Sequence, residues 1–129
     1  MTDPTVTTSA APEPRGPYPH VRTDERLAWV TGQIGRLAET GDFVDGGFEP
    51  EFHQAITNLE QILSEVGCGL GDVVRTEVQF VDEDDLDAMN AIYAERFTSP
   101  LPARTSYGAA FLWKGAKVQI SCVAALPAD

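Results

Sequence analysis

Apolar residues recur along the chain with two periods, one typical of helices and one typical of strands. Between Pro50 and Val66 they return every three or four residues, and Gly67 follows at the position where helices often end. Residues 82–97 begin with acidic side chains, which favour a helix N-terminus, and continue as an apolar stripe that closes at Phe97. The pattern therefore predicts two amphipathic helices.

Strict alternation of side chains predicts the strands. In residues 26–35 the apolar Ala28 and Val30 alternate with their neighbours until Gly32 interrupts the pattern. Residues 72–81 alternate β-branched and aromatic residues with charged and amide residues. Side chains two positions apart share one face of a strand, so each segment is expected to be a half-buried strand.

The segment 102–121, PARTSYGAAFLWKGAKVQIS, is predicted to be a β-hairpin that turns at its Lys-Gly step. The register of such a hairpin places Arg104, Ser106 and Gln119 on one face and the large apolar side chains on the other. We expect the two helices to cover the apolar face. The face of Arg104 and Gln119 is then left for a second subunit or a ligand.

The length of 129 residues is that of one domain with its own core. Residues 1–14 are mostly Thr, Ala and Pro, so they are expected to be a disordered lead to a folded domain over residues 15–129. The lead has no basic start and no apolar run of signal-peptide length, and no segment approaches the roughly 20 apolar residues of a membrane span. A cytoplasmic protein is expected.

Charge and cysteine usage exclude several classes of partner. Twenty acidic residues against nine basic ones give a formal net charge of −11, which repels nucleic acid and anionic membranes. Cys68 and Cys122 form no CxxC pair and are expected to be reduced thiols, and His20 and His53 are expected at the surface. Their spacing fits no zinc site, so no metal is expected.

The chain contains five short motifs that occur together: GPY at 16–18, VTGQIG at 30–35, MNAIYAERF at 89–97, PAR at 102–104 and KVQISCVA at 117–124. In this order and spacing, they resemble the Rid family of reactive-intermediate deaminases, also called YjgF proteins. The resemblance implies an α+β domain of the chorismate-mutase-like type, in which two helices cover one face of a mixed sheet. It also implies a homotrimer with ligand clefts between the subunits.

The activity that the resemblance implies is hydrolytic deamination of small carboxylated imines and enamines, such as 2-aminoacrylate. The products are a keto acid and ammonia, and no cofactor takes part. Arg104 is the implied carboxylate anchor, because a guanidinium binds a carboxylate through two parallel hydrogen bonds. The other implied cleft residues are Tyr18, Thr31, Asn90 and Ser106.

Gln119 departs from the family, whose typical deaminating members carry a glutamate that holds the attacking water. An amide can hold a water, but it is not basic enough to accept a proton at neutral pH. Three functions therefore stay open: a slow deaminase, a pathway-specific catalyst of tautomerisation, dehydration or cyclisation, and a regulator that binds a small metabolite without turnover.

Each implied site residue also has a purely structural interpretation. Arg104 suits an ion pair on so acidic a protein, and Gln119 suits an ordinary polar strand position. Tyr18 suits a packing aromatic, and Asn90 suits a polar helix residue beside an interface.

Overall fold

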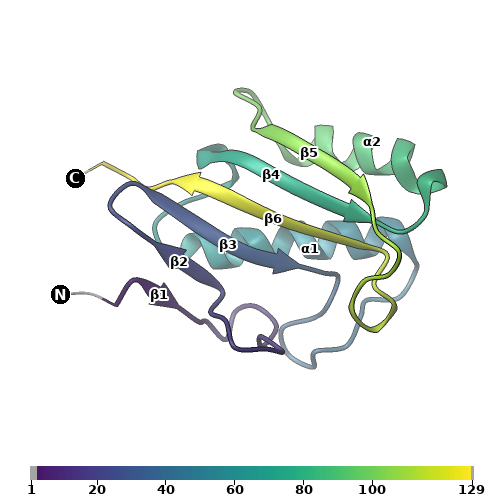
Figure 1. Ribbon diagram of the computed structural model, residues 1–129, viewed down its shortest axis with the longest axis horizontal. Helices are drawn as coiled ribbons and strands as arrows, with labels where there is room; N and C mark the ends of the chain where they lie inside the picture. Colours follow the sequence, from purple (N-terminus) through teal and green to yellow (C-terminus); the bar gives the residue numbers. More distant parts are fainter. Residues whose placement is uncertain (1–2, 129) are drawn as a thin grey trace.

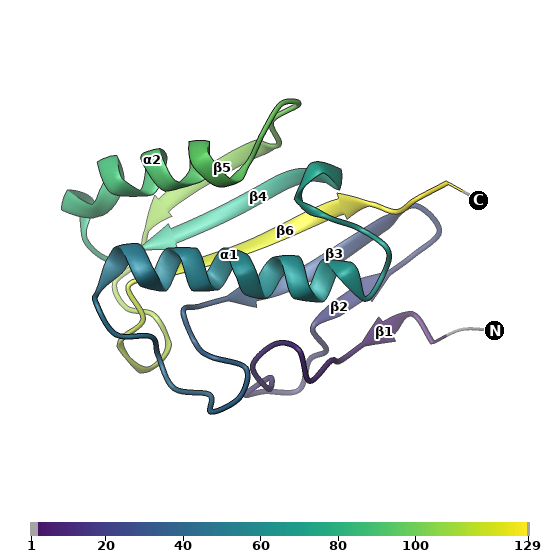
Figure 2. The same ribbon diagram turned by 180° about the vertical axis from the view of Figure 1, so that it is seen from behind.

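Two helices cover one face of a six-stranded mixed sheet, and the opposite face carries no helix within residues 3–128, which are the residues that the structure describes (Figure 1, Figure 2). The structure is a computed structural model. In chain order, the strands and α-helices are β1 (Thr5–Val6), β2 (Val21–Thr23), β3 (Leu27–Gln33), α1 (Phe48–Ser64), β4 (Val73–Phe80), α2 (Leu86–Arg96), β5 (Ala103–Gly108) and β6 (Val118–Ala125).

The strand order is β1-β2-β3-β6-β4-β5, so the last strand of the chain lies inside the sheet between β3 and β4 (Figure 1). β4 and β5 are parallel, whereas the other neighbouring pairs are antiparallel. A parallel pair needs a crossover connection, and α2 supplies it. β5 is therefore an edge strand beside α2 (Figure 2).

The two predicted helices are confirmed. α1 begins at Phe48 rather than at Pro50, and Gly67 follows its end with a φ of 77°, a left-handed conformation that glycine adopts without strain. The predicted second helix opens as a 3₁₀ turn over Glu83–Asp85, in which the Asp82 carboxylate accepts a hydrogen bond from the Asp84 amide. The acidic start thus caps the turn that leads into α2.

The core lies between the helices and the covered face of the sheet. α1 alone contributes the fully buried Phe52, Ile56, Leu59, Ile62 and Leu63. The expected free thiols are confirmed, because Cys68 and Cys122 are buried without a disulfide. Burial raises the pKa of Cys122 to about 12, so this side chain is a thiol at neutral pH. No helix among the described residues is long and apolar enough to cross a membrane.

The predicted β-hairpin is wrong. β5 pairs with β4, and β6 pairs with β3 and β4, so β5 and β6 are not neighbours. A loop joins them and contains a 3₁₀ turn over Trp113–Gly115, in which Lys114 has a φ of 52°. This loop breaks the strand alternation on which the predicted register depended.

Residues 3–14 pack against the domain, which differs from the disorder expected of residues 1–14. β1 pairs with β2, and Ala11 and Pro12 are buried. Residues 1–2, like residue 129, lie outside the described residues. The segment has few apolar side chains, and its attachment depends instead on backbone hydrogen bonds to its neighbours.

The surface position expected for His20 is wrong. His20 is only 1% exposed, and its Nδ1 accepts a hydrogen bond from the Thr8 amide at 3.0 Å. Because Nδ1 is an acceptor, the proton is on Nε2, which donates to the Pro12 carbonyl at 2.7 Å. His20 therefore fastens the N-terminal segment to the sheet. His53 is half-buried and contacts Arg96.

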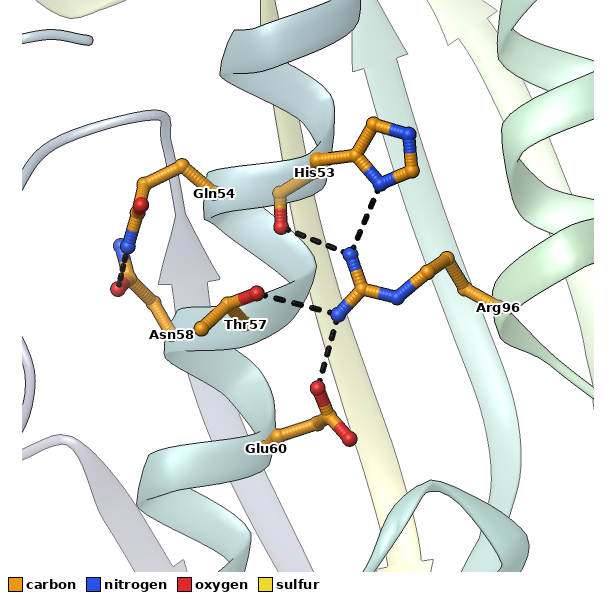
Figure 3. A network of polar contacts seen from close by, with 6 residues as sticks. All are labelled: His53, Gln54, Thr57, Asn58, Glu60 and Arg96. Carbon is orange, nitrogen blue, oxygen red and sulfur yellow. Dashed lines mark hydrogen bonds and ion pairs between the residues drawn. The ribbon is translucent and has the colours of Figure 1, made fainter.

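Arg96 joins α2 to α1 through four hydrogen bonds (Figure 3). Its Nη1 donates to Nδ1 and the carbonyl oxygen of His53, both at 3.0 Å. Its Nη2 donates to Thr57 Oγ1 at 3.1 Å and to Glu60 Oε1 at 2.8 Å. The Arg96 side chain is 18% exposed, whereas that of Glu60 is 46% exposed. The bonds to His53 and Thr57 are thus better shielded from water than the ion pair.

Replacing Arg96 by methionine should therefore destabilise the protein more than neutralising Glu60. We expect Arg96→Met to lower the free energy of unfolding by about 1–3 kcal/mol, because several charge-assisted hydrogen bonds are lost. Glu60→Gln removes only a half-exposed ion pair and should cost about 0–1 kcal/mol. Urea unfolding at one protein concentration measures both values. Equal losses in the two variants would show that the ion pair, and not the bonds to His53 and Thr57, holds α2 to α1.

Candidate ligand site

The predicted site residues form two groups on opposite faces of the sheet. The residues of β4 show on which face each group lies, because paired residues of neighbouring strands point to the same face of the sheet. Thr76 of β4 pairs with Arg104 and faces the helices, whereas Gln79 pairs with Gln119 and faces away from them. The expectation that Arg104 and Gln119 share a face is therefore wrong, because β5 pairs with β4 in parallel and not with β6 in a hairpin.

Arg104 contacts α2 on the helix-covered side. Its Nη2 donates to Asn90 Oδ1 at 2.7 Å, and its guanidinium lies 4.7 Å from the centre of the Tyr93 ring. Tyr93 is in turn held by Thr76, since their hydroxyl oxygens are 2.7 Å apart and hydrogen-bonded. Arg104 is thus oriented by a side-chain amide at one end and by an aromatic face beneath it.

Arg104 remains able to bind an anion. Among the described residues the ion pairs are Arg75–Glu77 and Arg96–Glu60, so Arg104 has no carboxylate partner within 4.0 Å there. Its neighbour Tyr93 does not provide a negative charge either. Burial raises the pKa of Tyr93 above its usual value, although the Thr76 hydrogen bond and Arg104 act in the opposite direction. The exposed guanidinium therefore keeps donors for a carboxylate.

Ser106 lies two positions after Arg104 on β5, on the same face. Its Oγ is buried and has no hydrogen-bond partner among the described residues. An unpaired buried hydroxyl costs about 1–3 kcal/mol, so a polar group placed beside it would be favourable. Arg104, Asn90 and Ser106 make up the first group.

Gln119 and Tyr18 make up the second group, in a pocket at one end of the sheet. The pocket is lined by Pro12, Glu13, Pro14, Arg15, Tyr18, His20, Gly32, Gln33, Ile34, Arg36, Trp113 and Gln119. Gln119 packs directly on Gly32, since a Cβ added to Gly32 would lie 2.8 Å from the Gln119 Cδ. Gly32, which interrupts the alternation in the sequence, thus makes room for the Gln119 side chain.

The Gln119 amide is oriented by hydrogen bonds that run across three strands. Its Nε2 donates to Gln79 Oε1 at 3.1 Å, and the Gln79 Nε2 donates to the Tyr107 hydroxyl at 2.8 Å. The Gln119 Oε1 accepts no hydrogen bond from the described residues and can accept one from a water or a ligand. Gln79 and Tyr107 were not among the predicted site residues, although the alternation in residues 72–81 places Gln79 on the polar side of its strand.

Thr31 lies near this group but its hydroxyl is already used. Thr31 Oγ1 donates to the Pro19 carbonyl at 2.7 Å, and its amide donates to the His20 carbonyl at 2.9 Å. Thr31 is not among the lining residues of the pocket, whereas the next residue, Gly32, is. Thr31 thus holds the segment that carries Tyr18.

Neither group contains a metal site. Within the described part of the chain, no three His, Cys, Asp or Glu side chains gather closely enough to hold a metal ion. The chemistry available to the two groups is therefore that of a guanidinium, two amides and hydroxyls. These can bind a carboxylate and position a water.

The comparisons with known proteins agree with the motifs. The sequence profile of the Endoribonuclease L-PSP family matches residues 8–126. A human 2-iminobutanoate/2-iminopropanoate deaminase is 38% identical over 119 residues, which are 92% of this chain and 87% of the human protein. A RutC family protein of Synechocystis is 38% identical over 98% of this chain and 99% of its own.

The solved structures agree with the fold. The crystal structure of RidA from an Antarctic Psychrobacter superposes with a TM-score of 0.91 at 29% identity and covers 95% of this chain and 98% of that one. The chain therefore belongs to the Endoribonuclease L-PSP family, which is the Rid or YjgF family that its motifs resemble.

Proposed function

We propose that the protein hydrolyses small carboxylated imines and enamines to keto acids and ammonia, at sites formed between the subunits of a homotrimer. The observation that carries this proposal is the separation of Arg104 from Gln119. A carboxylate anchor lies on one face of the sheet, and a water-holding amide lies on the other. One chain cannot apply both to one small molecule, whereas two chains can.

The uncovered face of the sheet supports the assembly. Trp29 and Tyr107 point from this face and are 43% and 47% exposed, and Val123 and Ser121 lie between them. A sheet face that carries exposed aromatic side chains is typically covered by another element. In a closed trimer, each chain covers this face of a neighbour and brings its Gln119 pocket toward the neighbour's Arg104.

In the proposed reaction, Arg104 binds the substrate carboxylate through two parallel hydrogen bonds, and Asn90 keeps the guanidinium in place. Gln119 Oε1 accepts a hydrogen bond from a water near the imine carbon. The water oxygen forms a bond to this carbon, and the C=N electron pair moves to nitrogen. Both protons of the added water pass in turn to the nitrogen. An electron pair of the oxygen then forms the carbonyl double bond as the C–N bond breaks, so that ammonia leaves and a keto acid remains.

The amide of Gln119 favours a second candidate function. Because this amide accepts no proton, the water must pass both of its protons to the substrate nitrogen without a protein base. The same site suits a catalyst of tautomerisation, dehydration or cyclisation, or a metabolite-binding regulator. An assay with imines generated in situ by an amino-acid oxidase distinguishes the deaminase from these alternatives. Faster keto-acid release with the protein than without it supports the deaminase.

The first prediction concerns assembly. Static light scattering should give about three times the 14.0 kDa chain mass, because a trimer buries the exposed aromatic face of the sheet. A monodisperse monomer at micromolar concentration would contradict both the assembly and the intersubunit site.

The second prediction concerns the anchor. Arg104→Lys should weaken the binding of 2-oxobutanoate by roughly 10–100-fold, because lysine keeps the charge but cannot offer two parallel donors. Calorimetry on the assembled protein measures the dissociation constant. Arg26→Lys, at an exposed arginine in the turn between β2 and β3, is the matched control and should bind normally. Equal affinity in the wild type and Arg104→Lys would exclude Arg104 as the anchor.

The third prediction concerns the missing base. Gln119→Glu should raise imine hydrolysis by about 10-fold or more if the protein is a deaminase slowed by its amide. The fold can accommodate the change, because a turned Gln79 amide donates to the new carboxylate and accepts from the Tyr107 hydroxyl. Gln61→Glu, on the exposed side of α1, makes the same charge change away from the pocket.

Keto-acid release is measured for the three proteins at equal concentration of assembled sites. A Gln119→Glu variant that folds and binds 2-keto acids, yet hydrolyses imines no faster than the wild type, would exclude the slow-deaminase function. The alternative catalyst or the regulator would then remain.

A further inference from the structure

The pocket that holds Gln119 also contains a buried arginine that the proposed reaction does not use. Arg36 is 6% exposed. Its Nε donates to the Gly41 carbonyl at 3.0 Å, and its Nη1 is 3.4 Å from the Glu13 carbonyl. Its Nη2 is buried and has no hydrogen-bond partner among the described residues. One end of a buried guanidinium is therefore unsatisfied.

Arg36 is held rigidly, although its charge is not neutralised. Its guanidinium lies 5.1 Å from the centre of the Trp113 ring, and Trp113 lies against Phe43. Burial, and then the nearby charge of Arg15, lower the pKa of Arg36 below its usual value. A buried charge without a counter-ion is costly, so an anion beside Arg36 would be strongly favoured.

Arg15 points to the same place. A Cβ on Gly41 would lie 3.4 Å from Arg36 Nη2 and 3.5 Å from Arg15 Nη2, so the two guanidinium groups approach one point. Neither arginine makes an ion pair with a carboxylate of the described residues. Glu13 also lines the pocket and is the acid whose charge acts on Arg36, yet its bond to Arg36 comes from the backbone. Two unpaired arginines meet here in a protein of net charge −11.

We propose that Arg36 and Arg15 form a subsite for a second acidic group, so that the preferred substrate is the imine or enamine of a dicarboxylic acid. Arg36 presents a donor in a fixed orientation, and the exposed Arg15 completes the pair. This inference rests on the proposed function, because the first carboxylate is assigned to Arg104 of a neighbouring subunit. The human relative is named for the imines of two monocarboxylic acids, so the inference sets this chain apart from it.

Keto acids matched in length test the subsite. Binding of 2-oxobutanedioate and 2-oxopentanedioate is compared with that of 2-oxobutanoate and 2-oxopentanoate by calorimetry at constant ionic strength. We expect each diacid to bind roughly 10-fold tighter than its monoacid partner, the worth of a charge-assisted hydrogen bond. In a Trp29→Phe background, Trp113 is the remaining tryptophan, and its fluorescence should change with the diacids.

Two variants each remove one arginine of the pair, and a third variant serves as the control. Arg36→Met and Arg15→Met should each lower the ratio of diacid to monoacid affinity toward one. Arg26→Met, at an exposed arginine in the turn between β2 and β3, should leave the ratio unchanged. Since Arg36 is buried, circular dichroism checks that its variant is folded; Arg15 is exposed, so its variant decides the question if Arg36→Met does not fold.

Equal wild-type affinity for the diacids and monoacids would overturn the inference. So would a ratio that survives both substitutions, or an equal weakening of both ligand classes, which would mean that the pair binds the first carboxylate. A separate measurement of imine hydrolysis distinguishes failure of the subsite from failure of the proposed function. Diacid preference without hydrolysis keeps the subsite and rejects the deaminase, whereas hydrolysis without preference keeps the deaminase and rejects the subsite.

Discussion

The parallel pairing of β4 with β5 is the constraint on which the site depends. α2 supplies the crossover that lets β5 run in the direction of β4, and β5 occupies the edge of the sheet. β6 then fills the place between β3 and β4. The same pairing turns Arg104 toward α2, where Asn90 and Tyr93 hold it, and leaves Gln119 on the uncovered face. In the proposed function, this separation is what makes a second subunit necessary.

Local patterns predicted the elements, but they could not predict which strands are neighbours. The period of apolar residues is set by how one helix or one strand meets the core, so α1 and β4 were readable from their own sequences. Strand pairing depends on residues far apart in the chain. The hairpin prediction counted alternation through residues 109–117, where the chain leaves the strand conformation and Lys114 adopts a φ of 52°. The predicted placement of Arg104 and Gln119 on one face of the sheet was therefore wrong.

Buried polar residues were the other feature that the sequence could not reveal. Three such residues, His20, Arg36 and Asn58, are each less than a tenth exposed, although polar residues are usually expected at the surface. Each satisfies backbone groups of irregular segments: Asn58 Nδ2, for example, donates to the carbonyls of Ile34 and Arg36. Such carbonyls need partners wherever a loop is buried, and the sequence does not show which loops are buried. The described pocket exists because these residues hold the loops that line it.

Gln119 and the arginine pair can be understood together. A carboxylate at position 119 would share a pocket with Arg36 and Arg15, which lack carboxylate partners of their own. It would attract their guanidinium groups and compete with any anionic group of a ligand. An amide does not compete in this way. Its Nε2 donates to Gln79, so its oxygen stays available to accept a hydrogen bond from a water. In the proposed site, a neutral amide at position 119 and two arginines without carboxylate partners therefore act in the same direction. Both favour a more acidic ligand, at the cost of a protein base for the attacking water.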